Sequence, residues 1–96
     1  MIVRIVKMTF QTEAVPEFLH IMKKSHHRIR SSAGCISLEV IQDLYQQNVF
    51  FTYSKWEDES NLNDYRNSEI FHEVWPATKA LFAAKPETWT LQPLTF

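Results

Sequence analysis

The sequence predicts an α+β fold of ferredoxin-like βαββαβ type, in which helices cover one face of an antiparallel sheet. Apolar runs rich in β-branched residues alternate with segments of helical periodicity, in the order strand, helix, strand, strand, helices, strand. The chain has 96 residues, which is the length of one domain. Its single glycine and four prolines favour long elements joined by short connections. We therefore expect one domain over residues 1–96.

A strand and a helix are expected in the first third of the chain. Residues 2–10 carry apolar side chains at both odd-numbered and even-numbered positions, which is typical of a strand with two buried faces. Thr12 is a suitable N-cap for the next helix, and Pro16 falls in its first turn, where a missing amide is tolerated. Helical periodicity then continues to about Ser32, and Gly34 is expected to end the helix.

The next two segments are expected to be strands joined by a short hairpin. Residues 35–43 alternate, which places Ile36, Leu38 and Val40 on one predicted face. Residues 44–48 form the connection, and residues 49–56 are aromatic and β-branched, as expected for a third strand.

Two helical segments and a last strand are expected in the second half. Asp58 and Ser68 are suitable caps for two short helices, the second reaching Phe82. Pro76 lies inside the second helical pattern and predicts a kink or a break there. Residues 88–95 are expected to form the last strand.

A sheet of this kind leaves one face without helices, and two interpretations of that face remain open. Because the first and third strands are apolar on both faces, a naked sheet would expose a patch that soluble monomers seldom show. A homodimer that packs sheet against sheet would cover this patch. Alternatively, the uncovered face is polar and solvated, and carries Arg4, Lys7, Glu39, Thr52 and Ser54.

Composition argues against several classes of protein. The formal net charge is -1 and the basic residues are scattered, so we expect no nucleic-acid partner. Arg4 and Lys7 interrupt the apolar N-terminus, as no signal peptide would, and no stretch approaches the length of a membrane span. The lone Cys35 forms no internal disulfide and reads as a small buried side chain. The expected location is cytoplasmic, without membrane contact.

Few residues are placed for metal, phosphate or nucleophilic chemistry. Gly34 is the only glycine, which excludes a Gly-rich phosphate loop and a nucleophile elbow. His26 and His27 are adjacent, so on a helix they point about 100° apart and do not form a metal pair. We therefore predict no metal site.

Aromatic side chains are concentrated between residues 56 and 82. They are Trp56, Tyr65, Phe71, Trp75 and Phe82, with His72 among them. Such a cluster is either an aromatic core or the wall of a pocket for a flat aromatic ligand, with hydroxyl, imidazole and indole groups as polar tips.

Several motifs along the chain occur in a characteristic order. Residues 33–40 (AGCISLEV) precede Gln42 and Asp43, and residues 50–58 (FFTYSKWED) contain a tryptophan at the expected strand end. Leu62, Tyr65, Ser68 and Phe71 follow at the spacing of a short helix and a Ser-x-x-Phe motif. Together these motifs resemble the second strand, third strand and following helices of the antibiotic biosynthesis monooxygenase (ABM) family. The resemblance covers nearly the whole chain.

The resemblance implies a dimeric α+β barrel and an oxygenase that uses O2 on a quinol, an anthrone or a similar phenol. It implies no cofactor, neither metal nor flavin. In that chemistry Trp56 and Tyr65 would orient the substrate, and His72 would accept its proton. The walls of the pocket would be Phe18, Met22, Phe71, Trp75 and Phe82.

Departures from the family pattern keep other functions open. Many members carry a histidine where Tyr65 stands, and tyrosine is a poor base near neutral pH. Haem-degrading relatives need an asparagine and a histidine at the places held here by Val6 and Trp75. The alternatives are a non-catalytic protein that binds a small aromatic molecule, and an isomerase or haem-binding relative.

Overall fold

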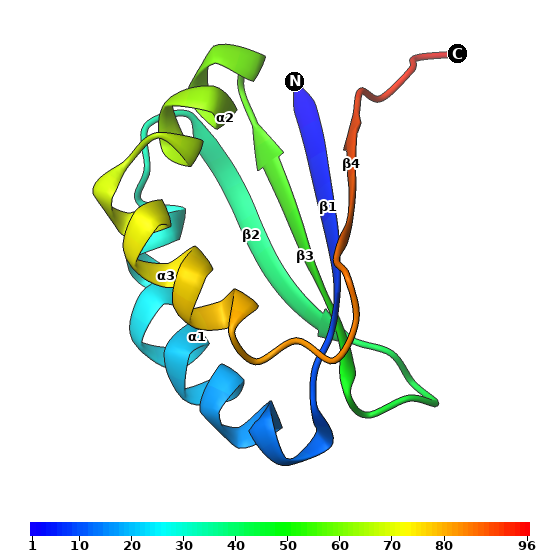
Figure 1. Ribbon diagram of the computed structural model, residues 1–96. Helices are drawn as coiled ribbons and strands as arrows, with labels where there is room; N and C mark the ends of the chain where they lie inside the picture. The colour runs from blue at the N-terminus through cyan, green and yellow to red at the C-terminus, as the bar shows by residue number, and fades with distance from the viewer.

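The computed structural model describes residues 1–96 and consists of a four-stranded antiparallel sheet with helices on one face (Figure 1). The elements in chain order are β1 (Ile2–Thr9), a 3₁₀ turn (Thr12–Ala14), α1 (Val15–Arg30), β2 (Cys35–Gln42), β3 (Val49–Trp56), α2 (Glu59–Arg66), α3 (Glu69–Lys79) and β4 (Glu87–Leu91). The strand order is β2-β3-β1-β4, and every pair is antiparallel. This is the predicted ferredoxin-like α+β fold. No helix combines the length and the apolar character needed to span a membrane.

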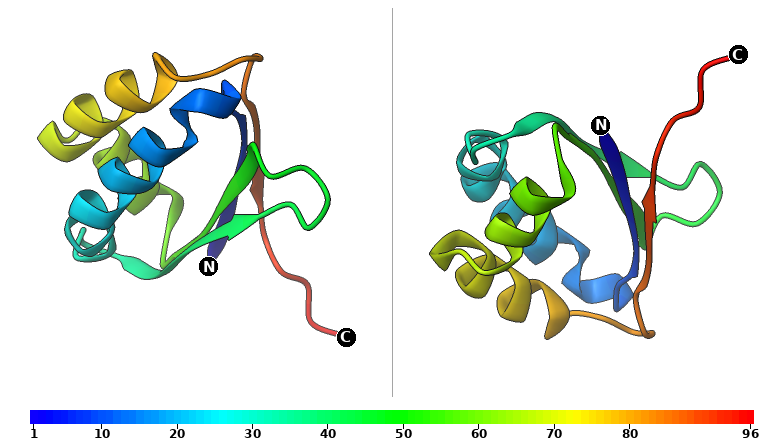
Figure 2. Two further views of the ribbon diagram at one scale, coloured as in Figure 1. Left: turned by 90° about the horizontal axis from the view of Figure 1, so that it is seen from below. Right: turned by 90° about the horizontal axis from the view of Figure 1, so that it is seen from above.

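The helices pack against one face of the sheet, and the opposite face is open (Figure 2). Even-numbered residues of β1 point toward the helices, and we call this side the inner face. The core lies there, around Phe10 and Phe18, whose side chains are fully buried and whose rings stack with centroids 4.2 Å apart. Met22 and Ile29 continue the buried side of α1, in keeping with their helical spacing from Phe18.

The start and end of α1 differ from the prediction in detail. Thr12 opens a 3₁₀ turn instead of capping α1, whose N-cap is Ala14 without a side-chain bond. Pro16 lies in the first turn as predicted. The helix ends at Arg30, and Gly34 adopts a positive φ of 79° in the turn before β2. A Cβ at this position would also collide with the side chain of Asn61, so both the backbone conformation and the available space favour glycine here.

A β-bulge in β2 corrects the predicted face of Ile36. The register against β3 shifts between Cys35 and Ser37, because one extra residue is accommodated there. Cys35 is therefore buried opposite Trp56, and Leu38 and Val40 continue the inner face. Ile36 is displaced to an exposed position.

The two C-terminal helices begin at the predicted caps. Asp58 accepts a hydrogen bond from the Ser60 amide, and Ser68 accepts one from the Phe71 amide. Of the kink or break predicted at Pro76, the break is wrong, because α3 runs through this residue to Lys79. Proline removes one amide, which would have bonded the carbonyl of His72, and that residue is exposed to water.

Arg4, Thr52 and Ser54 lie on the inner face, which corrects the alternative that placed them on a solvated surface. The outer face carries the odd-numbered residues of β1 and their partners, including the aromatic side chains of Phe51, Tyr53 and Trp89. The strand β4 covers residues 87–91 and is shorter than the predicted 88–95.

Candidate functional site

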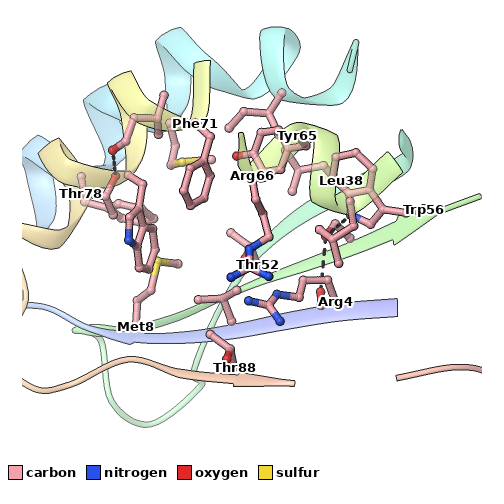
Figure 3. Close-up of a pocket in the computed structure, with 18 residues that line it drawn as sticks. Arg4, Met8, Leu38, Thr52, Trp56, Tyr65, Arg66, Phe71, Thr78 and Thr88 are labelled. Atoms are coloured by element: carbon pink, nitrogen blue, oxygen red, sulfur yellow. Dashed lines mark hydrogen bonds between the residues drawn. The ribbon is translucent and has the colours of Figure 1, made fainter. Parts of the chain in front are cut away.

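A cavity of about 270 Å³ lies between the inner face of the sheet and the helices (Figure 3). Eighteen residues line it, and twelve of them are hydrophobic. Six of the eight predicted site residues are among them: Phe18, Met22, Trp56, Tyr65, Phe71 and Trp75. The aromatic cluster of the sequence is therefore both a core and a cavity wall.

Stacked rings form a continuous wall along α2 and α3. Phe71 and Trp75 are one helical turn apart, so their rings meet on one side of α3, at 5.9 Å and nearly parallel. Tyr65 contacts Phe71 edge to face at 5.4 Å and stacks on Trp56 at 5.2 Å. Such contacts favour a fixed wall over a collapsible one.

Trp56 contributes its ring to the cavity, while its polar group is already engaged. The side chain is 1% exposed, and its indole Nε1–H donates a hydrogen bond of 3.0 Å to the Ser54 hydroxyl. Ser54 in turn is 3.5 Å from the carbonyl of Arg4. Trp56 is thus held in place by the sheet and offers a flat surface instead of a free donor.

Tyr65 lines the cavity as a protonated phenol. Burial raises its pKa to about 12, and the neighbouring Cys35 adds to the rise. Figure 3 shows its hydroxyl directed into the space between Phe71 and Arg66. A phenol that keeps its proton near neutral pH donates a hydrogen bond and does not accept a proton from substrate.

His72 and Phe82 lie outside the cavity. His72 follows Phe71, so on α3 it points about 100° away, and its side chain is exposed to solvent. Phe82 follows the end of α3 and packs on Phe10 and Trp75, with centroids 5.3 and 5.7 Å apart. It supports the wall from behind.

Apart from Tyr65, the polar residues that line the cavity were not predicted as site residues from the sequence. Arg4, Thr52 and Thr88 reach it from the sheet, and Arg66 reaches it from the end of α2. The sequence contained one indication of this, because Arg4 occupies an even-numbered position of β1, as do Val6 and the other inward-pointing residues. A charged side chain among the buried residues of a strand indicates a cavity or a partner group for the charge. Arg66 gives no comparable signal.

The other chemically capable side chains have structural contacts. Cys35 is buried, as expected, and burial raises the pKa of its thiol, which disfavours the nucleophilic thiolate. The imidazole of His26 bonds through Nε2 to the carbonyl of Leu38 at 2.9 Å, and joins α1 to β2. No three His, Cys, Asp or Glu side chains converge as a metal site would need.

Comparison with known proteins gives a consistent picture. The sequence model of the family described as antibiotic biosynthesis monooxygenase matches residues 1–75. A conserved protein from Methanosarcina mazei is 25% identical, with a TM-score of 0.90 over 96% of this chain and 92% of its own. A structure described as an antibiotic biosynthesis monooxygenase is 17% identical, with a TM-score of 0.93 over 99% and 100%.

A Pseudomonas aeruginosa protein has the same fold. It is 20% identical, with a TM-score of 0.86 over 98% of this chain and 94% of its own. No curated protein matches the sequence at a significant level.

Proposed function

This chain belongs to the antibiotic biosynthesis monooxygenase family, and we propose that it oxidises a small phenolic aromatic molecule with O2, without metal or flavin. The substrate would be a quinol or an anthrone. The observation that supports this most directly is the aromatic cavity between sheet and helices. Its walls, Trp56, Phe71 and Trp75, present flat apolar surfaces, and Tyr65 adds a protonated hydroxyl.

The proposed reaction proceeds through the anion of the substrate. At the CH₂ carbon of an anthrone, loss of a proton leaves an electron-rich enolate. The enolate passes an electron to O2, and a C–O bond forms to give a hydroperoxide after a proton returns. The O–O bond then breaks as water leaves, so that CH₂ and O2 become C=O and H₂O. The carbon supplies all the electrons that O2 takes up.

The protein's part in this reaction is to orient the ring and stabilise the anion. Stacked walls hold the ring, and the Tyr65 hydroxyl can donate a hydrogen bond to the enolate oxygen. No carboxylate or imidazole lines the cavity, and Tyr65 retains its own proton. The substrate proton would therefore leave to water and not to His72.

Oxygen uptake tests this proposal. The metal-free protein would be mixed with a panel of hydroquinones and anthrones on an oxygen electrode. We expect protein-dependent uptake with at least one compound, reduced by about a hundredfold in Tyr65→Phe if the hydroxyl stabilises the anion. Tyr45→Phe, in the exposed β2–β3 loop, is the matched control and should leave uptake unchanged. Absence of uptake across the panel would contradict the oxygenase.

A second function is favoured by the lack of a proton acceptor in the cavity. A pocket with aromatic walls, hydroxyl groups and no carboxylate or imidazole is also suited to binding a small aromatic molecule without turnover. Tight binding of a panel compound, measured by tryptophan fluorescence, combined with absent oxygen uptake would support this reading. Uptake would rule it out.

We also propose a homodimer formed through the outer face. Ile5 pairs with Tyr53 on one side and Trp89 on the other, so three apolar side chains form a row across the sheet. Trp89 and Leu91 are 40% and 46% exposed in the single chain. A patch of this kind on a four-stranded sheet favours a partner, and a second copy offers the same patch.

Light scattering tests the dimer. The wild type is expected to have the mass of two chains, and Trp89→Glu the mass of one, because a buried carboxylate is costly in an apolar interface. Glu87→Gln on the same strand is the control and should keep the mass of two chains. A wild type with the mass of one chain would contradict the proposal. The expected cytoplasmic location remains a prediction.

A further inference from the structure

Two guanidinium groups face the same cavity. Arg4 comes from the central strand β1, and Arg66 comes from the last turn of α2. Figure 3 shows the side chain of Arg66 extending toward the sheet, where its guanidinium lies near the guanidinium of Arg4 and beside Thr52. No Asp or Glu lines the cavity, so its wall carries two positive charges and no negative one.

These two charges have no anionic partner in the chain. The ion pairs of the structure are Lys7 with Glu87 and Arg28 with Glu73, both outside the cavity. Arg4 donates its one side-chain hydrogen bond, of 2.6 Å, to the neutral hydroxyl of Thr90. Burial and the charge of Arg66 both lower the pKa of Arg4. Arg4 is partly buried and Arg66 is exposed, and their like charges oppose one another, so an anion between them would relieve that repulsion.

A helix-terminal role accounts for only one of the two residues. A cation in the last turn of a helix interacts favourably with the helix dipole, which gives Arg66 a structural reason to be there. That reason does not extend to Arg4, which lies in the middle of the sheet on the inner face. The paired arrangement therefore needs a different explanation.

The cavity is also divided into a charged part and an apolar part. Arg4, Arg66 and Thr52 lie together on one side, and Met8 and Phe71 lie away from them (Figure 3). A dry cavity of about 150 Å³ holds a benzene molecule. The volume here, about 270 Å³, leaves room for one substituted ring or two fused rings.

We propose that the substrate or ligand of this cavity is an aromatic carboxylate, with its carboxylate between Arg4 and Arg66 and its ring against Phe71 and Trp75. The planar fork of a guanidinium matches the two oxygens of a carboxylate, which makes arginine the residue suited to that group. Thr52 adds a hydroxyl donor beside them. The inference rests on the proposed function for the reaction of the ring, but the recognition of the carboxylate stands on geometry alone.

Binding measured without turnover tests the inference. Under anaerobic conditions, 2-naphthoate and its neutral isostere 2-naphthamide would be titrated against the wild type by calorimetry. We expect the carboxylate to bind at least about tenfold more tightly than the amide, with a preference that shrinks as salt is raised. Equal affinities for the two compounds would overturn the proposal.

Variants locate the preference. Arg66→Gln, at the exposed end of α2, should remove most of the preference while amide binding changes little, and Arg4→Met should do the same if it folds. Arg28→Gln is the matched control, because that arginine pairs with Glu73 outside the cavity. A preference that survives Arg66→Gln and Arg4→Met would place the carboxylate elsewhere and contradict the assignment.

Failure of this inference is distinguishable from failure of the proposed oxygenase. Oxygen uptake with neutral quinols but no preference for naphthoate would overturn the carboxylate site and leave the oxygenase. A charge preference that depends on Arg66, without uptake of oxygen by any compound, would support the site and contradict the oxygenase.

Discussion

The two faces of the sheet each carry residues that are unusual for their surroundings. The inner face, which packs on the helices, carries Arg4 and Thr52 among its apolar residues. The outer face, which no helix covers, carries the aromatic side chains of Phe51, Tyr53 and Trp89. Polar groups on the covered face line a cavity, and apolar groups on the open face support the proposed dimer. Neither hydrophobicity nor charge alone assigns the two faces, because Arg4 lies on the covered face and Trp89 on the open one.

The largest effect is expected from the packed part of the inner face. Phe18 is fully buried and stacks on Phe10. Phe18→Ala should lower the free energy of unfolding by about 3–5 kcal/mol, because the lost burial is combined with a new cavity. Leu19→Ala, on the exposed side of α1, is the control for helix propensity. Urea unfolding with a loss below about 1 kcal/mol for Phe18→Ala would contradict the core position.

Tyr65 connects the cavity to stability at high pH. The pKa of Tyr65 is about 12 in the folded protein and about 10 in an unfolded chain. The protonated phenol therefore contributes fully to the free energy of unfolding below pH 10, and this contribution is lost as the pH rises to 12. The loss should amount to roughly 2–3 kcal/mol. Unfolding free energies at pH 9 and 11.5 should therefore differ less in Tyr65→Phe than in the wild type or Tyr45→Phe. Equal slopes in all three proteins would show that Tyr65 is not buried.

Ser68 joins the two helices that carry the aromatic wall. Its hydroxyl donates to the carbonyl of Tyr65 at 2.6 Å and accepts from the amide of Phe71 at 3.3 Å. Ser68→Ala should cost about 1 kcal/mol, as expected for an N-cap, whereas Ser68→Asp should retain most of the capping. Thermal unfolding of both variants measures the difference, and an unchanged midpoint for Ser68→Ala would argue against the cap.

The smallest effect is expected at Thr52, a polar residue of the inner face. If Thr52 serves the cavity and not the fold, Thr52→Val should change the unfolding free energy by less than about 1 kcal/mol, because the shape is kept. Thr78→Val is the comparison, since the Thr78 hydroxyl donates to the carbonyl of Val74 at 2.8 Å. A larger loss at Thr52 than at Thr78 would assign Thr52 to the fold.

The fold was predictable from the sequence because strand alternation, helical periodicity and two capping residues agreed. Asp58 and Ser68 begin the predicted helices. The bulge at Ile36 was not predictable, because an extra residue in a strand leaves no local mark in alternation. At Pro76 the sequence suggested a break that the structure does not have, because a helix tolerates one missing amide where the carbonyl left without it is exposed to water.

The candidate site was predictable in its walls and in Tyr65, but not in its other polar groups. Phe71 and Trp75 follow from helical spacing and aromatic content. His72 was selected for its chemistry, but its neighbour Phe71 takes the cavity side of α3, and both cannot occupy it. Arg66 reaches the cavity only through the packing of α2 on the sheet, which is a tertiary property (Figure 3).

The three tryptophans allow one measurement to test both faces at once. Trp56 and Trp75 line the cavity, and Trp89 lies on the outer face. Indole N–H signals would be recorded by ¹H–¹⁵N NMR, first while 2-naphthoate is added and then while the protein is diluted without it. The ligand is expected to shift the Trp75 signal, and the Trp56 signal with it, and dilution is expected to shift the Trp89 signal. A ligand response at Trp89 with none at Trp75 would contradict these expectations.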